Sequence, residues 1–304
     1  MTEAHSEQVE SDFQHTMPGA WEIFSVTLLP ALLSAIVLIA AAWLPRARAS
    51  AGPLAIGVAF ITGYFSLEKP GFPPQDNFNW LVFLAMLITA LATAVALLNA
   101  PTWTHWLLSL LLSVALVTRL LWPLLFPTDV ASHIRAWTAP AILLTFLSCL
   151  SIDTLARQTQ SASIPWIMTA CAGFSTLALG MSDSQKFGLM SAALTFACLP
   201  LIFLASRWQR WNLFRSTPWL FTLLWLGLLI NGHFWSNLRL PDALGLIIAP
   251  HATWLTEIPP LQRRLKPWQA NLLRVALVLI ILLAIVTPIA IRFHHDTQVF
   301  REDY

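Results

Sequence analysis

Long apolar runs recur along the whole chain and are separated by short polar connections. Ten of them are long enough to cross about 30 Å of hydrocarbon as helices, which takes roughly 17 to 25 residues. Their ranges are 24–44, 51–67, 80–99, 105–123, 138–155, 165–181, 187–206, 218–235, 241–257 and 270–292. The pattern predicts an all-α integral membrane protein, a polytopic bundle of about ten transmembrane helices.

The polar segments between these runs are too short to fold as soluble domains. We therefore expect a single ten-helix transmembrane domain over 24–292, a polar acidic tail over 1–23 and a short polar tail over 293–304. The first tail has no Lys or Arg, whereas a cleaved secretory signal begins with positive charge. This difference predicts that 24–44 is kept as a helix.

Composition agrees with a membrane protein. Hydrophobic residues make up 57% of the 304 residues and charged residues only 11%, whereas a soluble domain is roughly a quarter charged. The net charge of +2 provides no basic surface for phosphates. Nucleic acid is therefore excluded as a partner, and the lipid bilayer is the expected one.

The positions of Lys and Arg predict the orientation, because cytoplasmic loops hold an excess of them. With both termini outside, nine of these residues fall in inner loops and six in outer segments. The densest clusters, RWQRWNLFR (207–215) and QRRLK (262–266), both fall inside. The sequence predicts an N-out, C-out topology, in a membrane of the bacterial cytoplasmic (inner) type.

Arg119 stands out because it lies within the apolar stretch SVALVTRLLWPLLF (113–126). Trp122 favours the headgroup level, and Pro123 is the expected end of the helix. Arg119 then lies about one turn below the outer surface, where its side chain can reach outward. It either reaches the interface and pairs with an outer carboxylate, or it binds a substrate or anion. The candidate carboxylates are Glu68, Asp76 and Asp129.

His251 is the strongest site candidate. It lies about ten residues into span 241–257, or about 15 Å along a helix and close to the bilayer centre. Pro250 frees backbone carbonyls of the preceding turn, and Thr253 follows nearby. A broken helix with a titratable group at mid-depth is typical of transport sites. The alternative is a neutral histidine bonded to a neighbouring helix. We expect the span to cross the membrane with a kink, although a re-entrant loop is the other possibility.

Other polar groups have plainer interpretations. Asp153 and Arg157 are four residues apart, which predicts a helical ion pair. Glu257 is expected at the inner surface near the 262–266 cluster, and the polar residues of NGHFWSN (231–237) at a hydrated interface. Small residues at every fourth position predict close helix packing. These rows are Ala85, Thr89 and Thr93, and Ala172, Thr176 and Gly180.

Motifs for catalysis, metal binding or cofactor binding are missing from the sequence. It contains no G-x-S-x-G, H-E-x-x-H, P-loop or G-x-G-x-x-G. Cys149, Cys171 and Cys198 lie singly within apolar runs, so we expect them to be buried packing residues. We expect no catalytic residue, metal or cofactor; a membrane enzyme ranks third among the functions considered.

Two functions remain. The first is a small-solute or ion transporter, whose substrate-binding residues would be His251, Arg119, Pro250 and Thr253. The second is a non-catalytic membrane subunit or scaffold, whose apolar helix faces contact partner membrane proteins. A polar cavity shared by His251 and Arg119 would favour the transporter.

Overall fold

The computed structural model describes residues 19–69, 72, 74, 76–125, 131–159, 163–182, 184–207, 216–262 and 265–302. Within these ranges the chain is helical and contains no strand. The predicted tail up to residue 18, Asp129, most of the 207–215 cluster, and Arg263 and Arg264 lie outside them.

Every predicted span coincides with helical structure. The elements are α2 (Ala20–Trp43), η1 (Pro45–Ser50), α3 (Ala51–Leu67), α4 (Asn77–Leu97), α5 (Thr102–Leu121), η2 (Trp122–Leu124), α6 (Ala131–Thr159), α7 (Ser163–Gly180), α8 (Gln185–Arg207), α9 (Thr217–Trp235), α10 (Leu240–Ile248), η3 (Ala249–Glu257), α11 (Pro259–Gln262) and α12 (Pro267–Glu302). The η elements are 3-10 helices. α5 ends beside Trp122 and Pro123, as predicted.

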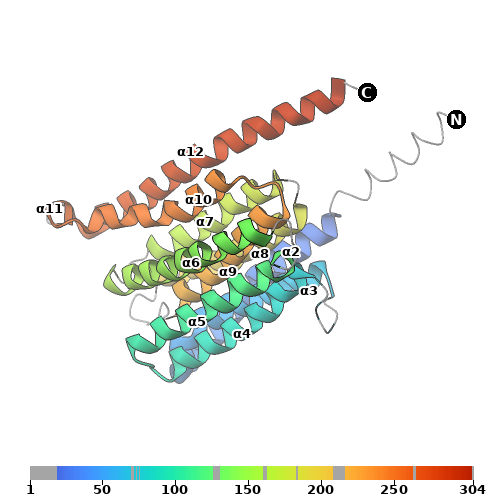
Figure 1. Cartoon of the computed structure of the whole chain (residues 1–304). Helices are drawn as coiled ribbons and strands as arrows, with labels where there is room; N and C mark the ends of the chain where they lie inside the picture. The colour runs from blue at the N-terminus through green and yellow to red at the C-terminus, as the bar shows by residue number, and fades with distance from the viewer. Residues whose placement is uncertain are drawn as a thin grey trace.

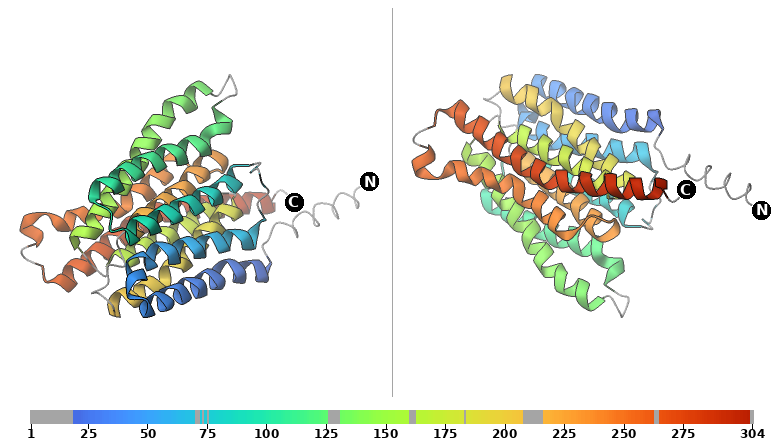
Figure 2. Two further views of the ribbon diagram at one scale, coloured as in Figure 1. Left: turned by 90° about the horizontal axis from the view of Figure 1, so that it is seen from below. Right: turned by 90° about the horizontal axis from the view of Figure 1, so that it is seen from above.

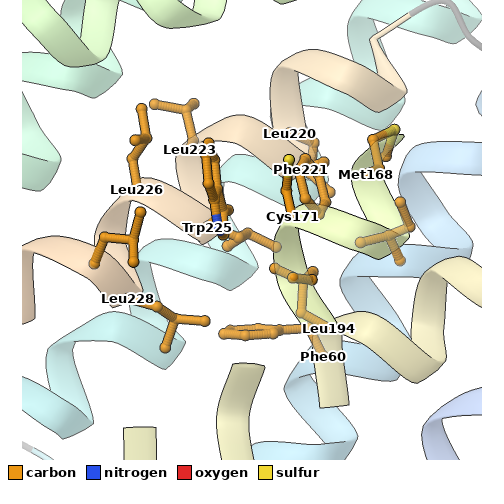
Figure 3. Packing of buried hydrophobic residues seen from close by; sticks show 14 of the residues in the cluster. Phe60, Met168, Cys171, Leu194, Leu220, Phe221, Leu223, Trp225, Leu226 and Leu228 are labelled. Carbon is orange, nitrogen blue, oxygen red and sulfur yellow. The ribbon is translucent and has the colours of Figure 1, made fainter. Parts of the chain in front are cut away.

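Helix α9 lies at the centre of the bundle (Figure 1). Every residue from Thr217 to Gly232 is buried, and α9 contacts α3, α4, α5, α6, α7, α8 and α10. A helix that is apolar all round buries all of its faces. Phe221 and Trp225 stack with ring centroids 6.0 Å apart and face Met168 and Cys171 of α7 (Figure 3). The Trp225 indole donates a hydrogen bond of 2.8 Å to Ser175 Oγ.

Eight of the described helices are long and apolar enough to cross a membrane: α2 to α8 and α12. This composition indicates a membrane-embedded helical protein. The two remaining predicted spans differ for separate reasons. α9 carries Thr222, Asn231 and His233, which lower its hydropathy, whereas the 241–257 span is divided into α10 and η3, each of nine residues. The division falls at Ala249 and Pro250, where a kink was predicted.

The two rows of small residues lie at helix contacts, as predicted. A Cβ atom on Gly57 of α3 would come within 2.1 Å of Thr89 Oγ1 of α4, so this approach requires glycine. Between α7 and α8, a Cβ on Gly188 would lie 3.0 Å from Gly180 Cα. Ser191 Oγ of α8 also donates to the Ala172 carbonyl over 2.9 Å. Small residues let these helix pairs pack closely in lipid.

The C-terminal segment, predicted as a short polar tail, is helical. α12 continues to Glu302, so residues 293–302 extend the last helix. Residues four positions apart are bonded there: Thr297 Oγ1 donates to the backbone carbonyl of Phe293 over 2.7 Å, and the side-chain nitrogens of Gln298 and His294 lie 2.9 Å apart. A side-chain pair such as Gln298 and His294 supports a helix beyond its apolar part. α12 packs along α7, α10 and η3 (Figure 1).

Candidate functional site

His251 is held against helix α6. Its Nδ1 lies 2.9 Å from Ser151 Oγ, and its Nε2 lies 3.2 Å from Ser148 Oγ. The Trp254 indole also donates to Ser151 Oγ, over 2.7 Å. A neutral imidazole has one donor and one acceptor nitrogen and satisfies both contacts. This arrangement matches the alternative in which the histidine bonds to a neighbouring helix.

Pro250 and Thr253 are buried in the same 3-10 helix as His251. Thr253 Oγ1 donates to the Pro250 carbonyl over 2.6 Å, and Thr256 Oγ1 donates to the Thr253 carbonyl over 2.8 Å. The threonine hydroxyls therefore satisfy two carbonyls of this segment within η3 itself. The three predicted residues lie together, but their polar groups are bonded to protein.

Arg119 lies elsewhere in the bundle. Its guanidinium carbon is 3.7 Å from the ring centroid of Trp80 in α4, a cation–π contact. Neither described candidate carboxylate pairs with it: Asp76 accepts from the Asn79 backbone N–H over 2.6 Å, and Glu68 pairs with Lys186 over 3.2 Å. Arg119 and His251 contact different helices and are not brought together.

Glu257 is not the surface residue that we expected. Its carboxylate lies 2.5 Å from Arg274 Nη2, and the two side chains are only 14% and 8% exposed. Arg274 also donates to Thr256 Oγ1 over 3.0 Å and to Asn271 Oδ1 over 2.9 Å. Sequence reasoning missed Arg274, although its position within the apolar run 270–292 was a usable signal. A charge in such a run requires a partner.

A second ion pair joins α10 to α12 at the other end of their contact. Arg292 Nη2 lies 2.5 Å from Asp242 Oδ2. Together with the Glu257–Arg274 pair, it fixes the α10–η3 segment along α12 at both ends.

The remaining predicted groups lie at helix contacts or within helices. The ion pair of Asp153 and Arg157 is confirmed at 2.8 Å, although the Asp153 side chain is only 7% exposed. Asn231 is fully buried and donates to the Gly227 carbonyl over 2.9 Å, which corrects its placement at a hydrated interface. Within the described ranges, no group of three His, Cys, Asp or Glu side chains could hold a metal ion.

A pocket of about 350 Å³ lies between α6, α9 and α10. Its walls are almost entirely carbon, and neither His251 nor Arg119 lines it. We call it the α6–α9–α10 groove. It is lined by Trp137, Pro140, Ala141, Leu143, Leu144, Leu147, Leu229, Ile230, His233, Phe234, Leu240, Ala243, Leu244 and Ile247.

Comparison with known proteins finds no matching protein family, no similar curated protein and no similar solved structure.

Proposed function

We propose that the protein is a non-catalytic integral membrane component, a subunit or scaffold that acts through its apolar helix faces. One observation carries this proposal: three ionisable side chains of the apolar spans, the partly buried His251 and Arg119 and the buried Arg274, contact protein groups. His251 contacts two serines, Arg119 contacts Trp80, and Arg274 contacts Glu257. Groups held in this way are poorly placed to bind a passing solute.

The proposed topology has ten crossings, formed by the eight long apolar helices, α9 and the α10–η3 segment. The start of α2 and the end of α12 lie at the same end of the bundle (Figures 1 and 2), which an even number of crossings requires. The excess of Lys and Arg in the inner loops supports N-out and C-out. A single transmembrane domain and a cytoplasmic-type membrane belong to the same proposal.

Labelling of single introduced cysteines tests the topology. Phe72→Cys in loop 68–79 and Asn212→Cys in loop 206–217 are placed on opposite sides by ten crossings. A membrane-impermeant maleimide should label Phe72→Cys and not Asn212→Cys in intact cells. The native Cys149, Cys171 and Cys198 are buried and provide a low background. Equal labelling of both variants would contradict ten crossings.

Purification in mild detergent tests the subunit function. A membrane-protein partner in constant stoichiometry should co-purify with the chain from its native membrane. The partner should dissociate when a large polar residue replaces Leu32 or Ile36, which are 56% and 59% exposed on α2. Matched polar substitutions at Leu272 and Ile280, exposed to 63% and 64%, test the exposed face of α12. A chain that purifies alone and moves solutes in liposomes would overturn the proposal.

A transporter is the second candidate, because the ninth span changes from α-helix to 3-10 helix at Pro250, next to His251. Such breaks often mark hinges or binding sites. Proton flux through reconstituted liposomes is the simplest measurement. A flux that His251→Gln abolishes and Arg119→Gln reduces would favour this function. Equal flux through liposomes with and without the protein would count against a proton-coupled site.

A further inference from the structure

The α6–α9–α10 groove is open along one side. Leu143 and Leu147, on its α6 wall, are 56% and 51% exposed. Figure 2 shows the N-terminal part of α6 diverging from the rest of the bundle. The groove volume of about 350 Å³ is at the small end of the range for ligand pockets. These features suit a slender apolar chain that enters from the side.

The walls of the groove exclude most polar ligands. Among its lining side chains, His233 is the only ionisable one, and its Nδ1 lies 2.9 Å from the Leu238 carbonyl. A polar ligand would lose its hydration there without gaining hydrogen bonds. In a bilayer, the apolar molecules that surround such a groove are acyl chains.

One exposed arginine lies at an end of the groove. Arg239 directly precedes Leu240, which lines the groove, and it forms no ion pair within the part of the chain that the structure describes. Arg135, two residues before Trp137, is directed elsewhere, because its Nη2 donates to the Leu125 carbonyl over 3.1 Å.

The nearby carboxylate does not neutralise Arg239. Asp242, in the first turn of α10, is paired with Arg292. This end of the groove therefore has positive charge beside an apolar channel. Arginine recognises phosphate with paired N–H donors, and basic sites between membrane helices bind lipid headgroups.

We propose that the groove binds one acyl chain of an anionic phospholipid, whose phosphate contacts Arg239. The tail lies along Leu144 of α6 and Leu244 of α10, which both line the groove. The site is separate from the subunit function proposed above, since it requires no protein partner.

Native mass spectrometry of the full chain in mild detergent tests this site. The chain is incubated with phosphatidylglycerol or with phosphatidylcholine of the same acyl chains. We expect one phosphatidylglycerol to remain bound under conditions that remove phosphatidylcholine. Inorganic phosphate in excess should not displace it, because the tail supplies much of the binding. Displacement by phosphate alone would overturn the tail site.

Variants separate the tail site from the headgroup site. Ala141→Trp fills the groove and should reduce retention about tenfold, whereas Leu32→Trp on the exposed face of α2 should leave retention unchanged. Leu147→Trp, at the open edge of the groove, serves as a second filling variant if Ala141→Trp fails to fold. Arg239→Gln should weaken phosphatidylglycerol about fivefold and leave phosphatidylcholine unaffected. The proposal would be overturned if the filling variants retained as much phosphatidylglycerol as Leu32→Trp. It would also be overturned if Arg239→Gln kept the same preference for phosphatidylglycerol over phosphatidylcholine.

Discussion

The two halves of helix α6 face the same neighbouring segment in different ways. Its C-terminal half, at Ser148 and Ser151, is bonded to His251 and Trp254 of η3. Its N-terminal half, between Trp137 and Leu147, is separated from α10 by the apolar groove. Helix α6 and the α10–η3 segment are thus in close contact only where polar side chains join them.

The properties of lipid as a solvent explain this difference. Apolar side chains gain little by leaving lipid tails for other apolar side chains. The apolar walls of the α6–α9–α10 groove can therefore remain apart. Hydroxyl, indole and imidazole groups have no water partner in hydrocarbon and must bond to protein. Polar contacts therefore determine which half of α6 meets the α10–η3 segment.

The largest effect should come from the ion pair that fixes η3 on α12. Arg274→Ala leaves Glu257 as a buried charge without its partner and should lower the free energy of unfolding by about 3–5 kcal/mol. Arg292→Ala, at the more exposed pair, should cost about 1 kcal/mol. Denaturant unfolding in micelles measures both. Equal losses would show that the burial of the first pair has no energetic consequence.

Leucines in the core and in the groove provide the next comparison. Leu224→Ala removes a fully buried side chain of α9 and should cost about 2 kcal/mol, mainly through lost packing contacts. Leu143→Ala, on the open wall of the groove, should cost less than about 0.5 kcal/mol because lipid replaces the lost contacts. A similar loss in both variants would mean that the groove wall is packed as tightly as the core.

His251→Ala tests the hydrogen bonds between η3 and the C-terminal half of α6. The loss of two hydrogen bonds across the helix contact should lower the free energy of unfolding by about 1–2 kcal/mol. Thr145→Ala is the matched control, because the Thr145 hydroxyl bonds only within α6, to the Ala141 carbonyl. If both variants lose the same free energy, the His251 contacts do not hold η3 to α6.

The smallest expected effect is the coupling between His251 and Ser148. A double-mutant cycle should give about 0.6 kcal/mol for this pair, the average for hydrogen bonds between membrane helices. The corresponding cycle of His251 with Thr145 should give a value near zero. A coupling that is absent from the first cycle would assign the stability of the contact to Ser151 and Trp254.

Sequence reasoning predicted several features at the level of single helices. The apolar helices, the end of α5 near Pro123 and the pair of Asp153 and Arg157 all depend on residues close together in the chain. The same reasoning placed Glu257 at the surface and overlooked Arg274. Those two residues are 17 positions apart and meet only because α12 returns along η3.

The residues of the candidate site show the same difference between local features and contacts with distant residues. The sequence indicated that His251 needs a partner, but it could not identify Ser148 and Ser151, which are about a hundred positions earlier. It placed Arg119 near the outer surface, either paired with a carboxylate or binding a substrate or anion, and did not identify Trp80, which the structure places beside it. Many apolar helix faces could cover either residue equally well, so no local pattern selects the correct neighbour.

The sequence by itself determined that this chain is a bundle of apolar helices. The length of an apolar run and the rise per residue set a helical span, and both are properties of a single segment. Only the tertiary structure decided that α9 is central, that α10–η3 is fixed to α12 at both ends, and that α6 leaves a groove beside α10. Helix association in lipid depends on small residues and a few polar contacts between distant segments. Those contacts exist only once the helices are assembled.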